Sequence, residues 1–222
     1  MKKRIKLLLC IALISSALCF FGCGGGDVPT DYPVMEAIDS SAVQTETANG
    51  VGVSANYDPN VWTFDGSGAS GNYTLYYNVD DNPNGLMNIN HAYPDEVANG
   101  TSYEKFMGML ENTYTSVLGA EIVKAEVCML EGKEIITIEM VSKMTDKMID
   151  LLLEQGTLTE EMIVNYGGRE ALLEIPPTMQ ISMTQFVDGQ AYTFVGSYYD
   201  ESQKQICLDG LKLVMQTLHT TN

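Results

Sequence analysis

The residues that could do chemistry in this chain of 222 residues are few and widely separated. Only two histidines are present: His91 ends an expected strand and His219 lies near the C-terminus. A histidine acts as a general base only when an acid or nucleophile is positioned beside it. The glycine-rich segment DGSGASGN contains Ser67 and Ser70, but it has neither the G-x-S-x-G elbow of a hydrolase nor the lysine of a phosphate-binding loop. The sequence therefore favours a protein that is not an enzyme, and a hydrolase is the least favoured class.

The segment DDNPNG has the spacing that begins a calcium loop. Asp80, Asn82, Asn84 and Gly85 match the pattern D-x-N-x-N-G, in which side-chain oxygens at alternate positions point at the ion. The twelfth position should be a bidentate glutamate, but here it is His91, and strands rather than helices are expected on both sides. Asn, Pro and Gly are also typical of a β-turn. We therefore expect a turn, with no metal and no cofactor, and keep the first three residues as weak calcium candidates.

The N-terminal segment has the pattern of an export signal. Four basic residues at positions 2–6 precede an apolar stretch at 7–21 that only Ser15 and Ser16 interrupt. A membrane-spanning helix needs about 20 apolar residues, so this shorter stretch fits a cleaved signal better. Gly22 then supplies the small residue that a signal peptidase needs beside its cut, directly before Cys23.

A small residue before a cysteine, after a short apolar run, resembles the lipobox of bacterial lipoproteins. The resemblance implies that the sulfur of Cys23 receives a diacylglycerol and that the chain is cut just before it. Phe20 and Phe21 depart from the pattern, since the family usually has leucine and then a small residue there. We expect residues 1–22 to be a lipoprotein signal peptide, and the protein to be lipid-anchored on a cell membrane, facing outside the cytoplasm. A plain secretory signal and an uncut N-terminal anchor are the alternatives.

The mature chain is expected to be strongly acidic. Cleavage before Cys23 removes four of the 12 basic residues and none of the 29 acidic ones, so eight stand against 29 and the formal charge is −21. This field repels nucleic acids and anionic lipid surfaces, and no nucleic-acid partner is expected. Cys128 and Cys207 are the cysteines that remain. The sequence is consistent both with one disulfide between them and with buried free thiols.

A change of composition near Gly50 divides the chain. Residues 24–50 are rich in Gly, Ser, Thr, Pro and Ala and show little periodicity. We therefore expect residues 23–50 to be a lipidated cysteine followed by a flexible tether. Residues 51–222 then form one domain, which is long enough to bury a core without a disulfide.

The periodicity of apolar residues within this domain predicts an α+β fold. A helix is expected after Thr101, which forms a capping box with Glu104, and another after Asp200, with Gln203 as its partner. Two-residue turns at 131–132 and 188–189 predict β-hairpins, and hairpin-linked strands favour an antiparallel sheet flanked by helices. Strands are expected at 51–57, 73–79, 86–91, 121–130, 133–142, 178–187 and 190–199.

Residues 143–177 form a helical insertion between two of these strands. Threonine starts and glycine stops mark helices at 145–156 and 159–168, and Pro176-Pro177 ends the helical stretch. Methionine-rich helix faces can form adaptable binding surfaces, but more often they belong to the core. The candidates for partner binding are Met144, Met148, Leu151 and Leu152.

Three local features of the domain resemble the PsbP-like family. They are a strand leading into YDPNVW at 57–62, the helix start SYEKF at 102–106, and the ending DGQAYTFVGSYYDESQKQICLDGLKLVMQTL at 188–218. This is the family of the extrinsic photosystem II protein, and the Ran-binding nuclear transport factor and several bacterial lipoproteins share its fold. The resemblance covers most of 51–222 and departs at 143–177. It implies an antiparallel sheet between helices in an α/β/α sandwich, and it implies no catalytic residue.

The anchor, the tether and the resemblance together predict a non-catalytic lipoprotein that binds a protein partner or helps to assemble an envelope complex. The alternative is a module that binds a small molecule or an ion and uses the insertion 143–177 as a lid. A pocket between the insertion and the sheet would favour this alternative, whereas a converging serine, histidine and acid would favour a hydrolase.

Overall fold

The structure is a computed structural model that describes residues 31–50, 52–65, 73–77, 85–91, 100–116, 118–154, 156 and 158–221. The expected signal peptide, Cys23, and the calcium candidates Asp80, Asn82 and Asn84 lie outside these residues. Among the helices described, none is long and apolar enough to cross a membrane.

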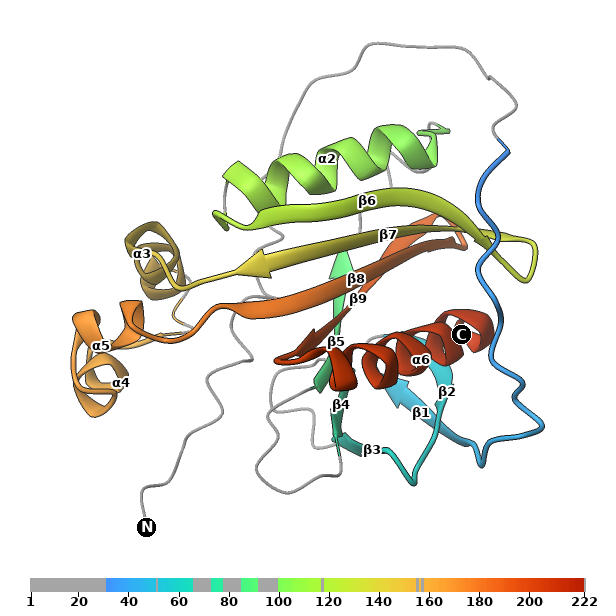
Figure 1. Cartoon of the computed structure of the whole chain (residues 1–222), viewed down its shortest axis with the longest axis horizontal. Coiled ribbons are helices and arrows are strands. Elements are labelled where there is room, and N and C mark those ends of the chain that lie inside the picture. The colour runs from blue at the N-terminus through green and yellow to red at the C-terminus, as the bar shows by residue number, and fades with distance from the viewer. Residues whose placement is uncertain are drawn as a thin grey trace.

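Seven of the described strands form one antiparallel sheet in the order β3-β4-β5-β9-β8-β7-β6 (Figure 1). The α+β class and the antiparallel sheet predicted from the sequence are confirmed. The strands are β3 (Trp62–Asp65), β4 (Thr74–Tyr77), β5 (Gly85–His91), β6 (Glu121–Leu130), β7 (Lys133–Ser142), β8 (Thr178–Val187) and β9 (Gln190–Tyr198).

A smaller sheet lies beside the first one. Within the described chain its three strands are β1 (Glu46–Gly50), β2 (Val53–Tyr57) and β10 (His219–Thr220), with β2 in the centre. The strand expected at 51–57 is therefore confirmed as β2, whereas β1, β3 and β10 were not expected. Each of these strands is short and is held by hydrogen bonds to a neighbouring strand, so its own sequence carries a weak signal.

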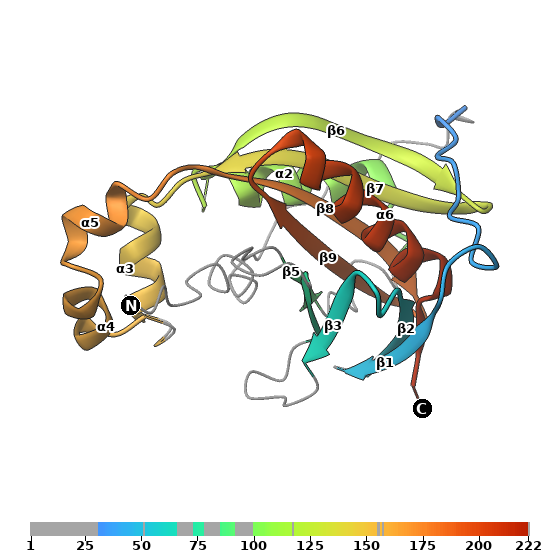
Figure 2. The ribbon, with the colours of Figure 1, turned by 60° about the horizontal axis from the view of Figure 1, so that its bottom comes forward.

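Two long helices cover opposite faces of the large sheet. α2 (Tyr103–Ser116) packs over β6 and β7, and α6 (Glu201–Thr217) packs over β8, β9 and β2 (Figure 2). The apolar stripe expected on the last helix is confirmed: its members lie in the core between α6 and the two sheets. They are Cys207, Leu211, Val214 and Leu218.

The start of α2 differs from the prediction by one residue. Ser102, not Thr101, caps the helix, because its Oγ accepts a hydrogen bond from Lys105 N at 3.3 Å and its carbonyl accepts one from Phe106 N. Glu104 accepts a hydrogen bond from Tyr32. Asp200 caps α6 as expected, by accepting from Gln203 N at 3.1 Å.

Both predicted two-residue hairpins are present. Glu131 and Gly132 have φ values of 49° and 77°, and Asp188 and Gly189 have 48° and 75°. Positive φ at both central residues is the type I′ geometry that matches the twist of the flanking strands. The two turns lie at the same end of the large sheet, because β7 pairs antiparallel with β8. We call this end the hairpin end; the insertion 143–177 joins β7 to β8 at the other.

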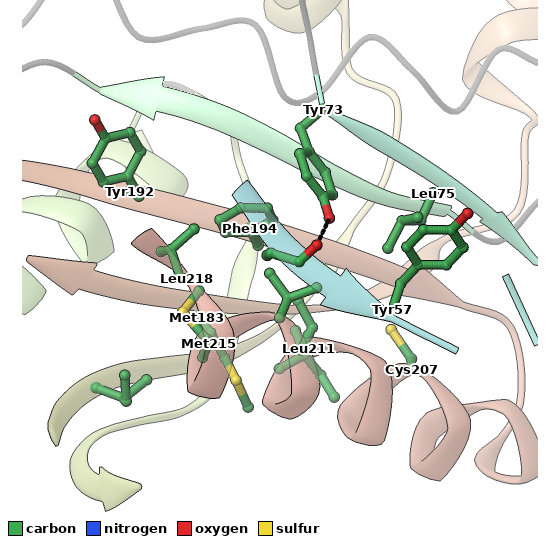
Figure 3. Packing of buried hydrophobic residues seen from close by; sticks show 14 of the residues in the cluster. Tyr57, Tyr73, Leu75, Met183, Tyr192, Phe194, Cys207, Leu211, Met215 and Leu218 are labelled. Atoms are coloured by element: carbon green, nitrogen blue, oxygen red, sulfur yellow. Dashed lines mark hydrogen bonds between the residues drawn. The ribbon is translucent and has the colours of Figure 1, made fainter. Parts of the chain in front are cut away.

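The core on the α6 side is closed by aromatic contacts. Tyr73 and Phe194 meet edge to face with ring centroids 5.5 Å apart, and Tyr73 donates a hydrogen bond to the carbonyl of Ala55 at 3.2 Å (Figure 3). Cys128 and Cys207 lie in the same core as buried free thiols, so the alternative without a disulfide holds. Burial raises the pKa of both thiols, and that of Cys207 rises to about 12.

The expectation of a flexible tether at 23–50 is wrong for residues 31–50, which belong to the domain. Residues 31–45, which we call the strap, run across the hairpin end of β6 and β7 and lead into β1 (Figure 1). Val34 forms a parallel bridge with Met129, and Ile38 is hydrogen-bonded to Gln216 of α6. The low periodicity of this segment reflects an exposed chain held mainly by its backbone. Of the expected tether, only residues 23–30 lie outside the described chain.

Candidate functional site

The insertion 143–177 forms a compact unit at one end of the large sheet, and we call it the helical head. It contains α3 (Asp146–Glu154), α4 (Glu160–Asn165) and α5 (Arg169–Leu173), which lie beyond the ends of β7 and β8 (Figures 1 and 2). Local capping explains two of these helices. Thr145 Oγ1 accepts from Met148 N and Thr159 Oγ1 accepts from Met162 N, each at 3.2 Å.

Two of the four predicted contact residues are instead core residues. Met148 and Leu152 are fully buried, and Met144 and Leu151 are half-buried. The reason is that the apolar face of α3 closes on the apolar faces of α4 and α5. The buried apolar side chains of the head are Met148, Ile149, Leu152, Leu158, Ile163 and Leu172. Met148 and Leu152 are therefore unavailable to a partner, whereas Met144 and Leu151 keep part of their surface exposed.

An arginine clamp holds α5 against α3. Arg169 Nε donates to Asp146 Oδ1 at 2.6 Å, and its Nη2 donates to Asp146 O at 2.9 Å and to Asp150 Oδ1 at 2.7 Å. These hydrogen bonds to the two carboxylates raise the pKa of Arg169 above its ordinary value. One planar guanidinium thus fixes the first turn of α5 to successive turns of α3. The clamp joins α5 to α3, and the apolar core of the head holds both α4 and α5.

The outer surface of the head presents apolar side chains among acids. Val164 of α4 is 73% exposed and Leu173 of α5 is 38% exposed. Glu160 precedes Val164 by one helical turn, and Glu170 precedes Leu173 in the same way, so each apolar residue has an acid on its own helix face. We call Val164, Leu173 and these glutamates the acidic–apolar surface. The methionine argument of the sequence analysis did not single out these residues.

The sequence carried a signal for Val164. Once Thr159 is taken as the N-cap, Met162, Ile163 and Tyr166 share one face of α4 at helical spacing and leave Val164 on the opposite one. The whole head has seven acidic and three basic residues, which gives it a formal charge of −4. Its surface is therefore suited to a partner that is basic and partly apolar.

A second polar feature lies in the middle of the large sheet. Ser142 Oγ donates to Gln180 Oε1 at 2.9 Å, and Gln180 Nε2 donates to Ser197 Oγ at 3.2 Å, across three neighbouring strands. Antiparallel partners and alternate residues point to one face, so Ser182 lies on the same face as this chain. Its Oγ is buried and has no hydrogen-bond partner among the described residues. We call these four residues the polar stripe.

Metal-ligating residues do not gather in the part of the chain that the structure describes: no group of three or more His, Cys, Asp and Glu side chains is close enough to hold an ion. His219 is exposed, and its Nδ1 lies 2.9 Å from the carbonyl oxygen of Thr217. The calcium pattern at Asp80, Asn82 and Asn84 stays a prediction, because those residues are outside the described chain.

Neither a protein-family model nor a curated protein sequence matches the chain. Among solved structures, cyanobacterial PsbP from Synechocystis sp. PCC 6803 is similar at 15% identity over 90% of this chain and 98% of that one, with a TM-score of 0.47. The Ran-binding protein Mog1p of Saccharomyces cerevisiae is similar at 6% identity over 80% and 96%, with a TM-score of 0.49. A PsbP and a Ran-binding protein are the two kinds of protein named with the PsbP-like family in the sequence analysis. The likeness concerns the fold alone.

Proposed function

We propose that this chain is a non-catalytic binding protein, held on a membrane by a lipid on Cys23, which binds a protein partner through the acidic–apolar surface of its helical head. One observation carries the proposal: Val164 is 73% exposed on a short helix that begins with Glu160 and Glu161. An exposed valine costs little when isolated. With acids on the same short helix, it provides an apolar centre with a polar rim, the arrangement found in many protein interfaces.

Charge decides the class of partner. The head carries a formal charge of −4 within a mature chain of −21, so an acidic protein or a nucleic acid would be repelled. A basic surface with an apolar centre would gain both from steering and from burying Val164 and Leu173. The arginine clamp of α5 keeps the surface preformed, which reduces the ordering cost of binding.

The membrane anchor is supported by the sequence alone. Gly22-Cys23 follows a basic start and a short apolar stretch, as in bacterial lipoproteins. Cells that express the protein with a fatty-acid label should give a labelled membrane protein, and Cys23→Ala should lose the label and the membrane retention. Unchanged retention without Cys23 would contradict this part of the proposal.

The binding surface can be tested by site-specific photocrosslinking in the native host. A photoreactive phenylalanine analogue at position 164 should give a discrete adduct, and the same analogue at position 34 should not. Val34 is a matched control, because it is 82% exposed on the strap, at the end of the large sheet opposite to the head. Once the adduct is identified by mass spectrometry, the purified partner provides the quantitative test.

Calorimetry with that partner should show weaker binding when Val164→Asp is introduced, by at least about tenfold, as expected for a central contact residue. Replacing both Glu160 and Glu161 by lysine should weaken binding further at low salt than at high salt. Val34→Asp should leave the affinity unchanged. Equal affinities for the variants at 164 and 34 would rule out the head as the contact surface.

The polar stripe favours a second candidate function, the binding of a small neutral ligand. Hydroxyl and amide groups line the stripe without any charge, and Ser182 offers a buried hydroxyl that lacks a partner within the described part of the chain. Native mass spectrometry of protein extracted from its own membrane should then reveal a bound small molecule. Ser182→Ala should lose it without loss of stability, because the hydroxyl makes no described hydrogen bond. A ligand-free spectrum would remove this candidate.

A further inference from the structure

The strap is tied to the domain at three separate places. Tyr32 donates a hydrogen bond to Glu104 at the start of α2. Met129 of β6 donates from its N to Pro33 O at 2.9 Å and accepts at its O from Met35 N at 2.8 Å. Further along, the backbone of the strap is bound by a side chain of α6. The chain therefore leaves the domain at Tyr32 rather than at residue 51.

This attachment shortens the connection between Cys23 and the domain. Nine residue steps separate Cys23 from Tyr32, so the two can be at most about 30 Å apart in any conformation, and about 17 Å apart on average for a flexible chain. A free tether that extended to residue 50 would have reached about 95 Å. The domain is therefore held close to whatever Cys23 is attached to.

The strap and the helical head lie at opposite ends of the large sheet (Figure 1). The strap pairs with Met129, next to the turn at 131–132, whereas the head begins after Ser142, the last residue of β7. β7 is 10 residues long, which corresponds to about 33 Å. The acidic–apolar surface thus lies at the end of the large sheet opposite to the exit point of the chain.

We infer that the strap holds the hairpin end of the sheet towards the membrane and directs the helical head away from it, so that the head meets its partner in the aqueous space beyond the lipid surface. This inference rests on the proposed lipid at Cys23. The acidic charge of the head acts in the same direction, because an anionic lipid surface repels it. The partner is then a water-soluble basic protein or an exposed domain of one.

Energy transfer to labelled vesicles tests this orientation. The chain from Cys23 to Asn222 is joined through the Cys23 thiol to a maleimide phospholipid in phosphatidylcholine vesicles that carry an acceptor dye on their headgroups. Cys128 and Cys207 are buried, so Cys23 is the thiol that reacts. A donor dye is attached by click chemistry to an azide-bearing residue at position 34 or at position 164. Val34 and Val164 are a matched pair, being 82% and 73% exposed.

Transfer from position 34 should exceed transfer from position 164 by at least about twofold, since a strand of about 33 Å separates the two ends. Equal transfer from positions 34 and 164, or stronger transfer from position 164, would overturn the inference.

A longer tether tests whether the short connection through the strap is what sets the orientation of the domain. Insertion of 12 Gly and Ser residues after Gly26 should bring the transfer values of positions 34 and 164 closer together, because the domain can then rotate freely. An unchanged ratio would show that the strap does not set the orientation. Because the lipid is attached chemically, neither outcome depends on whether cells lipidate Cys23. That question belongs to the labelling experiment with Cys23→Ala.

Discussion

The side-chain amide of Gln216 forms hydrogen bonds with both the N–H and the carbonyl group of Ile38. Ile38 N donates to Gln216 Oε1 at 2.9 Å, and Gln216 Nε2 donates to Ile38 O at 3.1 Å. The amide thus pairs with the strap as a neighbouring strand would, although the two residues are 178 positions apart in the sequence. This contact and the backbone pairing at Met129 turn an expected tether into part of the domain.

Gln216→Ala should release the middle of the strap. We expect a loss of about 1–2 kcal/mol in the free energy of unfolding, because two backbone groups lose their partners, and faster cleavage between residues 36 and 45 by added protease. Gln205→Ala is the matched control on the same helix, since Gln205 makes an exposed bond to Asp209 at 2.7 Å. If both variants were cleaved at the same rate, the Gln216 contact would not be what holds the strap.

One substitution at a buried residue and one at an exposed residue test how the interior of the head is packed. Met148→Glu places a carboxylate in a site with no exposure, and we expect it to lower the free energy of unfolding in urea by about 3–5 kcal/mol. Val164→Glu, on the exposed face of α4, should change it by no more than about 0.5 kcal/mol. Equal effects of the two substitutions would contradict the assignment of Met148 to the core and Val164 to the surface.

Local signals account for the parts of the fold that the sequence predicts well. The turns at 131–132 and 188–189 are set by their own two residues, and α6 by the cap at Asp200. The strap and β1 have no such signal. In β1, only Ala48 is buried, and the strand exists because its backbone pairs with β2. β2 follows β1 directly in the chain, whereas the strap depends on Met129 and Gln216, which lie far away in the sequence.

The site shows the same division. The periodicity of the insertion identifies helices with apolar faces, but it does not say which faces close on one another. Met148 is buried because α4 and α5 fold back onto α3, an arrangement that Arg169 fixes through Asp146 and Asp150. Val164 is exposed for the same reason. Whether an apolar residue of the head lies in the core or on the surface is therefore decided by tertiary packing.

The two hairpins differ in the residue that must adopt a left-handed conformation. Asp188 suits a positive φ, because the short side chains of Asp and Asn tolerate the left-handed region, whereas the glutamate at position 131, with φ of 49°, is less suited to it. Glu131→Asn should therefore raise the free energy of unfolding by about 0.5–1 kcal/mol. Glu131→Gln is the control, because it removes the same charge without the left-handed preference. A gain of equal size in both variants would mean that charge, not backbone conformation, is responsible.

Because of its buried thiols, the domain should have a lower free energy of unfolding in mild alkali than at neutral pH. The pKa of Cys207 is raised to about 12 by burial, against about 8.5 in an unfolded chain, so the unfolded state loses its proton first and is stabilised as pH rises. Stability due to this group is complete below about pH 8.5 and declines above it. Between pH 8 and pH 9.5 we expect this thiol to account for a loss of about 1 kcal/mol in the free energy of unfolding. Urea unfolding of Cys23→Ser should show this loss together with those from Cys128 and from tyrosines whose pKa is also raised, and adding Cys207→Ala should remove about 1 kcal/mol of it. A slope that Cys207→Ala leaves unchanged would show that this thiol is not protected from ionisation in the folded domain.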